Sequence, residues 1–134
     1  MSQETEIVAL NGSRDSAPAR EIALDLGRLL EEHKGGKVVV LDLRDMNAWT
    51  DFFVIATATS GAHREGLERH IKEFAAQREI EIFRQSPKLA AEEDWRIVDL
   101  GTIVIHIMSE KARNFYELER LWSAARVIFP SDRH

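Results

Sequence analysis

Apolar and polar positions alternate along this chain with two periods, one typical of helices and one of strands. Apolar residues three or four positions apart predict three amphipathic helices, which lie at residues 16–35, 60–78 and 111–125. Short apolar or alternating stretches with many β-branched residues predict five strands, which lie at residues 38–41, 52–58, 79–84, 95–98 and 102–108. Residues 1–15 show no sustained period, so we expect a flexible N-terminal extension there.

The predicted elements follow in the order helix, two strands, helix, three strands, helix. Strands joined through a helix favour a parallel pair, and the last two strands favour a hairpin. We therefore expect an α/β fold with a mixed sheet of about five strands flanked by helices. A single domain of this kind would span residues 16–129, with residues 130–134 as a short tail.

The last two predicted strands carry the most informative pattern. A two-residue turn on Leu100 and Gly101 would join them as a hairpin, with Trp95 opposite His106. Because side chains alternate between the two faces of a strand, one face is then apolar and predicts core: Val98, Ile103, Ile105 and Ile107. The other face is mixed and carries Trp95, Ile97, Asp99, Val104, His106 and Met108. Either this mixed face binds a protein, or a helix covers it and His106 is a hydrogen-bonded core residue.

Composition narrows the kind of partner. The 134 residues include 23 acidic and 18 basic side chains, for a net charge of -5, and no cationic stripe stands out. This balance disfavours direct nucleic-acid binding and favours a protein partner. No apolar run has the length of a membrane helix, and no basic-then-apolar leader opens the sequence, so we expect a cytoplasmic location and no membrane. The absence of cysteine rules out a disulfide framework and a thiol nucleophile.

The candidate chemistry is sparse. Asp42, Asp45 and Asp51 could supply carboxylate oxygens for a hard cation, but no two of them share one strand in an Asp-x-Asp pattern. Asp99 and His106 could form a dyad, but a nucleophile would have to come from elsewhere, with Thr57, Thr59 and Ser60 as the possible hydroxyls. The five histidines are scattered, and no glycine-rich phosphate loop is present. We therefore expect no catalytic residue, no metal site and no cofactor.

Three ordered segments resemble the ribosomal silencing factor family, also called Iojap-like. Residues 50–57 (TDFFVIAT) are similar to its T-D-[YF]-F-V-I-x-T segment, and residues 95–106 to its W-x-[LIV]-[LIV]-D-x-G motif that ends in histidine. Residues 115–122 resemble its F-Y-x-L-E-x-L-W motif. The resemblance covers residues 17–125 or so. The chain departs from the family pattern at Ala58, where glycine is usual, and at Trp49, where a smaller aliphatic residue is usual.

The resemblance implies a fold akin to nucleotidyltransferases but without their catalytic carboxylates. It implies a non-enzymatic function: binding to ribosomal protein fourteen of the large subunit at the intersubunit face, which blocks subunit association. Translation would thereby be repressed when nutrients or energy are scarce. Family members are commonly homodimers when free. The acidic balance of the chain suits a basic ribosomal partner, because complementary charge speeds encounter.

The resemblance also implies which residues bind the partner, with Trp95 first among them. The predicted set is Trp95, Asp99, Leu100, Gly101, His106, Met108, Tyr116 and Glu119. In the final helix, Phe115, Leu118, Leu121 and Trp122 are expected to be core. Two alternatives stay open at this point: a metal-dependent nucleotidyltransferase-like enzyme that uses Asp42, Asp45 and Asp51, and a dimeric scaffold whose mixed face pairs with itself.

Overall fold

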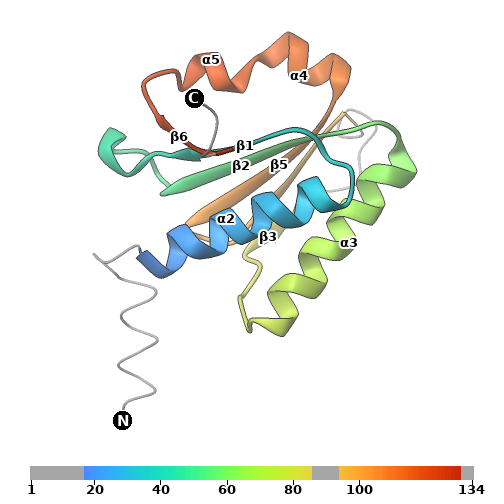
Figure 1. Ribbon diagram of the computed structural model, residues 1–134, viewed down its shortest axis with the longest axis horizontal. Coiled ribbons are helices and arrows are strands. Elements are labelled where there is room, and N and C mark those ends of the chain that lie inside the picture. The colour runs from blue at the N-terminus through green and yellow to red at the C-terminus, as the bar shows by residue number, and fades with distance from the viewer. Residues whose placement is uncertain (1–16, 86–93, 131–134) are drawn as a thin grey trace.

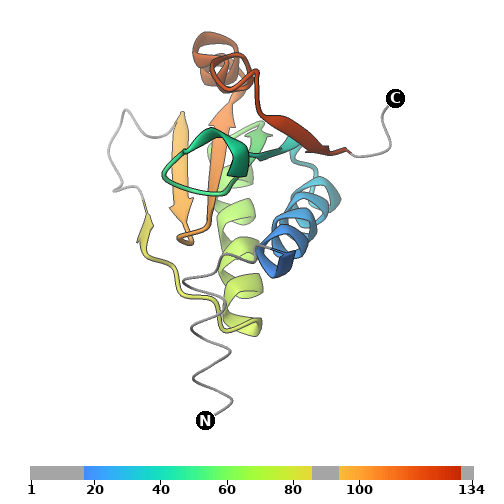
Figure 2. The same cartoon turned by 90° about the vertical axis from the view of Figure 1, so that its left-hand side faces the viewer.

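The computed structural model describes residues 17–85 and 94–130 (Figure 1). The expected N-terminal extension, most of the loop before Trp95 and residues 131–134 lie outside the described residues. Within the two described ranges, no helix is long and apolar enough to cross a membrane. One mixed sheet runs through the molecule, and helices lie on both of its faces (Figures 1 and 2).

The sheet has six strands in the order β3-β4-β5-β2-β1-β6. Their bounds are β1 (Gly36–Asp42), β2 (Phe52–Ala58), β3 (Arg84–Gln85), β4 (Trp95–Asp99), β5 (Ile103–Ser109) and β6 (Arg126–Phe129). The central pair, β2 and β5, is parallel, and every other neighbouring pair is antiparallel. The predicted α/β class and mixed sheet are confirmed, with one strand more than the sequence pattern suggested. The likeness to nucleotidyltransferases stays a prediction.

Two long helices cover one face of the sheet, α2 (Ala17–Glu32) and α3 (Gly61–Gln77). Two short ones lie over the other face, α4 (Glu110–Tyr116) and α5 (Leu118–Leu121) (Figures 1 and 2). Ser60 is the N-cap of α3, because its hydroxyl accepts a hydrogen bond from the His63 amide at 3.0 Å. A short 3₁₀ helix, η1 (Arg44–Met46), follows β1.

Each face of the sheet has its own hydrophobic core. The first core packs the apolar stripes of α2 and α3 on the sheet, and it contains Leu26, Leu30, Leu67, Ile71, Val54, Ile105 and Ile107. The second core lies under α4 and α5, and it contains Leu41, Phe53, Ile55, Val104, Met108, Ala112 and Leu118. Because β2 lies at the centre and is covered on both sides, all seven of its residues are buried. This is the reason for its continuous apolar run.

The turn between β4 and β5 is longer than the predicted two-residue turn on Leu100 and Gly101. Asp99 pairs with Val104, and the Leu100 amide donates a hydrogen bond to the Ile103 carbonyl oxygen at 2.8 Å. The register is therefore shifted by two positions, and Trp95 pairs with Met108 instead of His106. Because the shift is even, every side chain keeps its predicted face. The division into an apolar face and a mixed face is confirmed.

The predicted strand over residues 79–84 is wrong, because β3 comprises only Arg84 and Gln85. Glu79 adopts a positive φ of 58° at the end of α3, and the Ile80 amide still bonds back to the Ala75 carbonyl. Ile80 and Ile82 pack against the first core as part of the connection from α3 to the edge of the sheet. The alternation of apolar and polar residues here thus reflects packing of Ile80 and Ile82 on the core, and these residues do not form a strand.

The predicted final helix over residues 111–125 is interrupted. Glu117 adopts a left-handed conformation with φ 49°, which separates α4 from α5. After Trp122 the chain turns and enters β6, the edge strand beside β1 that the sequence pattern missed. Phe115, in α4 before the break, faces outward. Its side chain is 77% exposed, so the expectation that it belongs to the core is wrong.

Candidate partner-binding surface

A row of aromatic side chains crosses the mixed face of the sheet. Trp95 on β4 stands next to His106 on β5, whose ring lies 4.5 Å from that of Phe53 on β2. Phe53 in turn contacts Trp122 after α5, with ring centroids 5.6 Å apart, and Trp49 before β2, at 6.1 Å. Phe53 and His106 are buried, whereas Trp95 and Trp122 are partly exposed. The row therefore has a buried centre and accessible aromatic ends.

One hydrogen bond fixes the indole of Trp95. Its Nε1 donates to Nδ1 of His106 at 3.1 Å. His106 is only 4% exposed, and burial lowers its pKa to about 4 because the charged imidazolium is poorly solvated there. The histidine is thus neutral at physiological pH, and its Nδ1 is free of a proton and able to accept.

The predicted binding residues divide into buried and accessible members. His106 is buried, Met108 is buried beneath α4 and α5, and Leu100 belongs to the first core. Asp99 is buried too. Trp95 and Gly101 are partly exposed, and the side chains of Tyr116 and Glu119 lie outside the described residues. Met108 packs with Ala112 and Leu118 of the helices, and His106 is a hydrogen-bonded core residue, as the second interpretation of the sequence expected. Partner binding by the eight residues stays a prediction.

The turn after β4 is held by contacts from both sides. Asp99 Oδ1 accepts a hydrogen bond from the Gly101 amide at 2.8 Å, and Thr50 Oγ1 donates to the Gly101 carbonyl at 3.0 Å. Gly101 has φ +94°, and a Cβ added to it would lie 2.6 Å from the ring of Phe83. Asp99 and Gly101 of the family motif therefore shape the turn. Their contacts within the turn explain why an aspartate and a glycine stand there, and no binding partner is needed for that explanation.

Four large apolar side chains are exposed among the described residues: Trp49, Phe83, Phe115 and Val127. None of them belonged to the predicted binding set. Trp49 is 64% exposed at an end of the aromatic row. Its departure from the usual aliphatic residue was the one signal in the sequence that marked it. Phe115 and Val127 gave no such signal: Phe115 fits the apolar spacing of the predicted helix, and Val127 lies in the unpredicted strand β6.

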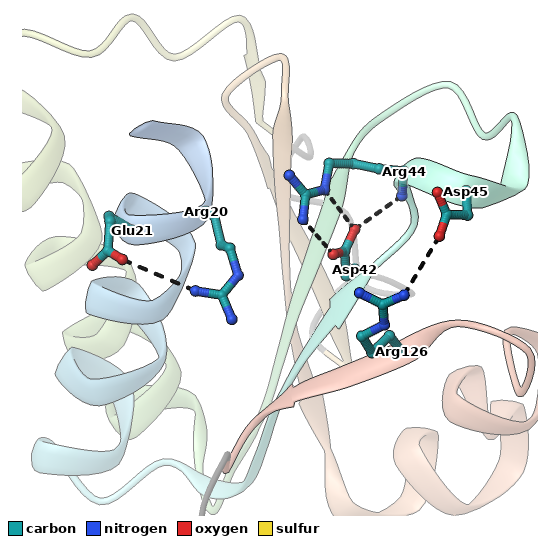
Figure 3. A network of polar contacts seen from close by, with 6 residues as sticks. All are labelled: Arg20, Glu21, Asp42, Arg44, Asp45 and Arg126. Atoms are coloured by element: carbon teal, nitrogen blue, oxygen red, sulfur yellow. Dashed lines mark hydrogen bonds and ion pairs between the residues drawn. The ribbon is translucent and has the colours of Figure 1, made fainter. Parts of the chain in front are cut away.

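The carboxylate that the metal hypothesis placed at the end of β1 is already engaged (Figure 3). Asp42 Oδ2 accepts from Arg44 Nη2 at 2.7 Å, and Oδ1 accepts from Arg44 Nε at 2.9 Å and from its backbone amide at 3.0 Å. Burial alone would raise the pKa of Asp42, but these hydrogen bonds outweigh it and the pKa lies below its ordinary value. Asp45 points instead toward Arg126 of β6, at 3.6 Å. Among the described residues, no three histidine, aspartate or glutamate side chains gather as a metal ion would require.

Comparison with known proteins shows which family the chain resembles. A family model described as "Ribosomal silencing factor during starvation" matches residues 16–134. The chain is 39% identical over 85 residues to the ribosomal silencing factor RsfS of Treponema pallidum, which covers 63% of this chain and 75% of that protein. It is 34% identical over 94 residues to RsfS of Haemophilus influenzae, which covers 70% of this chain and 90% of that protein.

The fold has close counterparts among solved structures. A crystal structure of a Chromobacterium violaceum protein superposes with a TM-score of 0.68 and covers 77% of this chain and 85% of that one. At 23% sequence identity, this likeness speaks for the fold alone. The family model, in contrast, spans the described sheet and all of its helices. The chain belongs to the ribosomal silencing factor family.

Proposed function

We propose that this protein binds the large ribosomal subunit through the surface around Trp95 and thereby prevents the small subunit from joining. Membership of the family supports a role in translation regulation, and the names of its relatives refer to ribosomal silencing. The partner on the large subunit is ribosomal protein fourteen, at the face where the two subunits meet. The protein acts in the cytoplasm when nutrients or energy are limiting.

The observation that carries this proposal is the arrangement of Trp95. Its indole is partly exposed, and its polar atom is tied to a buried histidine. A tryptophan of this kind is a favoured anchor at protein interfaces, because it buries a large area and has little conformational freedom to lose. Its place on a central layer of the fold keeps it rigid, which lowers the entropic cost of binding.

The mechanism needs affinity and bulk, without a catalytic step. Interactions with a basic ribosomal protein suit a chain of net charge -5. Once seated on the joining face, a folded domain of this size leaves no space for the small subunit. Asp42 supports the non-enzymatic interpretation, since its oxygens accept three hydrogen bonds from Arg44. Calorimetry with magnesium and a nucleoside triphosphate is expected to give no binding heat, and a saturable signal would revive the enzyme hypothesis.

Replacing Trp95 tests the binding surface directly. Trp95→Ala is expected to weaken binding to purified large subunits by about 2 kcal/mol, or roughly 30-fold, as for other central aromatic anchors. Binding is measured by co-sedimentation over a range of subunit concentrations. Val127→Ala serves as the control, because Val127 is an exposed apolar side chain on β6, at the far edge of the sheet from β4 and outside the aromatic row. Equal losses in both variants, or no loss in either, would remove Trp95 from the site.

The free protein is proposed to form a homodimer. If the dimer buries Trp95, dimerisation and binding to the large subunit use the same surface and compete. Light scattering over a range of concentrations is expected to show a concentration-dependent dimer that Trp95→Ala weakens and Val127→Ala preserves. A dimer that persists unchanged on the large subunit would show that the two surfaces are separate.

A further inference from the structure

The hydrogen bond between Trp95 and His106 has a direction that the chemistry of the two side chains dictates. An indole nitrogen can only donate, so Nδ1 of His106 must accept. The proton of the neutral imidazole then lies on Nε2. That atom is fully buried and has no hydrogen-bond partner among the described residues. His106 thus satisfies Trp95 and leaves its own second nitrogen unsatisfied.

An unmet buried donor destabilises a folded protein. The surroundings of His106 are otherwise apolar: the ring of Phe53 lies 4.5 Å away, and Ile55 and Ile97 are its neighbours across the strands. A leucine or methionine would suit this position better for stability alone. Stability alone therefore does not explain why a histidine stands here. Among the described residues, the hydrogen bond of its ring is the one from the Trp95 indole.

We propose that His106 is a positioning residue, which holds the Trp95 indole in the orientation that binds the large subunit and does not itself touch the partner. This inference rests on the proposed function, because it assigns the reason for which Trp95 is held. Three facts support it: the 3.1 Å hydrogen bond, the burial of His106 against Phe53, and the partial exposure of Trp95. Without the acceptor, the indole loses one of the contacts that fix its orientation, and binding must restore the order that is lost.

The proposal separates stability from binding in two variants. His106→Leu removes both nitrogens, so the fold is expected to be retained or stabilised while affinity for the large subunit falls roughly fivefold. His106→Asn keeps an oxygen near the position of Nδ1 but adds a buried amide donor. This variant is expected to unfold at a lower temperature than the leucine variant and yet to bind more tightly. If affinity followed stability in both variants, the role of His106 would be structural only.

A double-mutant cycle completes the test. Trp95→Phe keeps an aromatic ring but lacks the N–H group, so His106 can no longer act through it. In that background, His106→Leu is expected to cause no further loss of affinity in co-sedimentation, whereas in the wild-type background it does. Additive losses would show that His106 contributes by another route and would overturn the proposal. A loss with Trp95→Ala but none with His106→Leu would likewise reject it while the proposed function stands; no loss with Trp95→Ala would reject both.

Discussion

At the residue scale, several buried polar groups are satisfied by side chains or amides only two positions away. Asp42 is bound by Arg44, and Asp99 by the Gly101 amide. These short-range hydrogen bonds lie at the ends of strands, where the backbone changes direction. They satisfy carboxylates that would otherwise be buried without a partner. The two aspartates that invite a catalytic interpretation from the sequence therefore have local structural roles.

The pair of Asp42 and Arg44 predicts a pH-dependent contribution to stability. Because the pKa of Asp42 is lowered in the folded state, its contribution is complete above the ordinary aspartate pKa of about 3.9 and is lost as the pH falls below it. Asp42→Asn is expected to reduce the free energy of unfolding by roughly 1 to 2 kcal/mol at pH 7, since a hydrogen-bonded ion pair with a partly exposed partner is lost. The difference from wild type should shrink near pH 3, as urea titrations at both pH values would reveal.

Asp45→Asn is the matched control for this experiment. Asp45 lies three residues further along, and its side chain is 88% exposed where it meets Arg126. A surface pair of this kind contributes little to stability. A loss as large for Asp45→Asn as for Asp42→Asn, or a difference that stays constant down to pH 3, would contradict the assignment.

Gly101 predicts a second effect at this scale. Its φ of +94° and the Phe83 ring both oppose a side chain, so Gly101→Ala is expected to destabilise the fold by about 1 to 3 kcal/mol. Gly66→Ala is the control, because Gly66 lies within α3 and a Cβ there meets only the flexible end of Arg69. That change should stabilise by roughly 0.5 to 1 kcal/mol. Thermal unfolding of both variants should give shifts of opposite sign, and shifts of the same sign would refute this account of the turn.

At the element scale, α4 is attached to the sheet by one buried arginine. Arg113 is buried, and its guanidinium donates to Thr57 Oγ1 and to the Lys37 carbonyl oxygen, both at 2.7 Å. These contacts join the helix to β1 and β2 across more than fifty residues of sequence. The helix is too short to be stable on its own, so such contacts decide where it lies.

Arg113→Ala is accordingly expected to destabilise the protein by about 2 to 4 kcal/mol, because the buried Thr57 hydroxyl and the part-buried Lys37 carbonyl oxygen lose their donor, and the buried space of the guanidinium is left unfilled. Hydrogen exchange should show the largest loss of protection in α4 and α5. Arg120→Ala is the control, since Arg120 is exposed and pairs only at the surface with Glu117. If the amides of α4 remained protected in Arg113→Ala, the anchor would have to lie elsewhere.

The sequence predicted the regular elements well where their apolar period was sustained. The helices α2 and α3 and the strands β2, β4 and β5 follow directly from that period. The break at Glu117 could not be predicted, because apolar positions at 118, 121 and 122 continue the helical spacing across it. Strand β6 was missed for a related reason. Its pairing with β1 is a contact between distant segments, and four residues carry too little local pattern.

At the scale of the whole molecule, the sheet brings together groups that lie far apart in the sequence. The aromatic row joins Trp49, Phe53, Trp95, His106 and Trp122 across three strands and two loops. Alternation along the last hairpin predicted the face of Trp95 and His106, and the family motif pointed to both. Their hydrogen bond and the contact with Phe53 depend on strand order, which no local pattern contains. The buried state of His106 is therefore a property of the assembled sheet.

The central claim also concerns the whole molecule: a rigid domain binds the large subunit through Trp95 and thereby prevents the small subunit from joining. Purified large subunits are incubated with the protein, small subunits are added, and the mixture is separated by sedimentation on a sucrose gradient. Large subunits that carry the wild-type protein are expected to remain free, and Trp95→Ala is expected to restore joined ribosomes at the same protein concentration, while Val127→Ala continues to block. Joined ribosomes that still carry the wild-type protein, or full blocking by Trp95→Ala, would contradict the account.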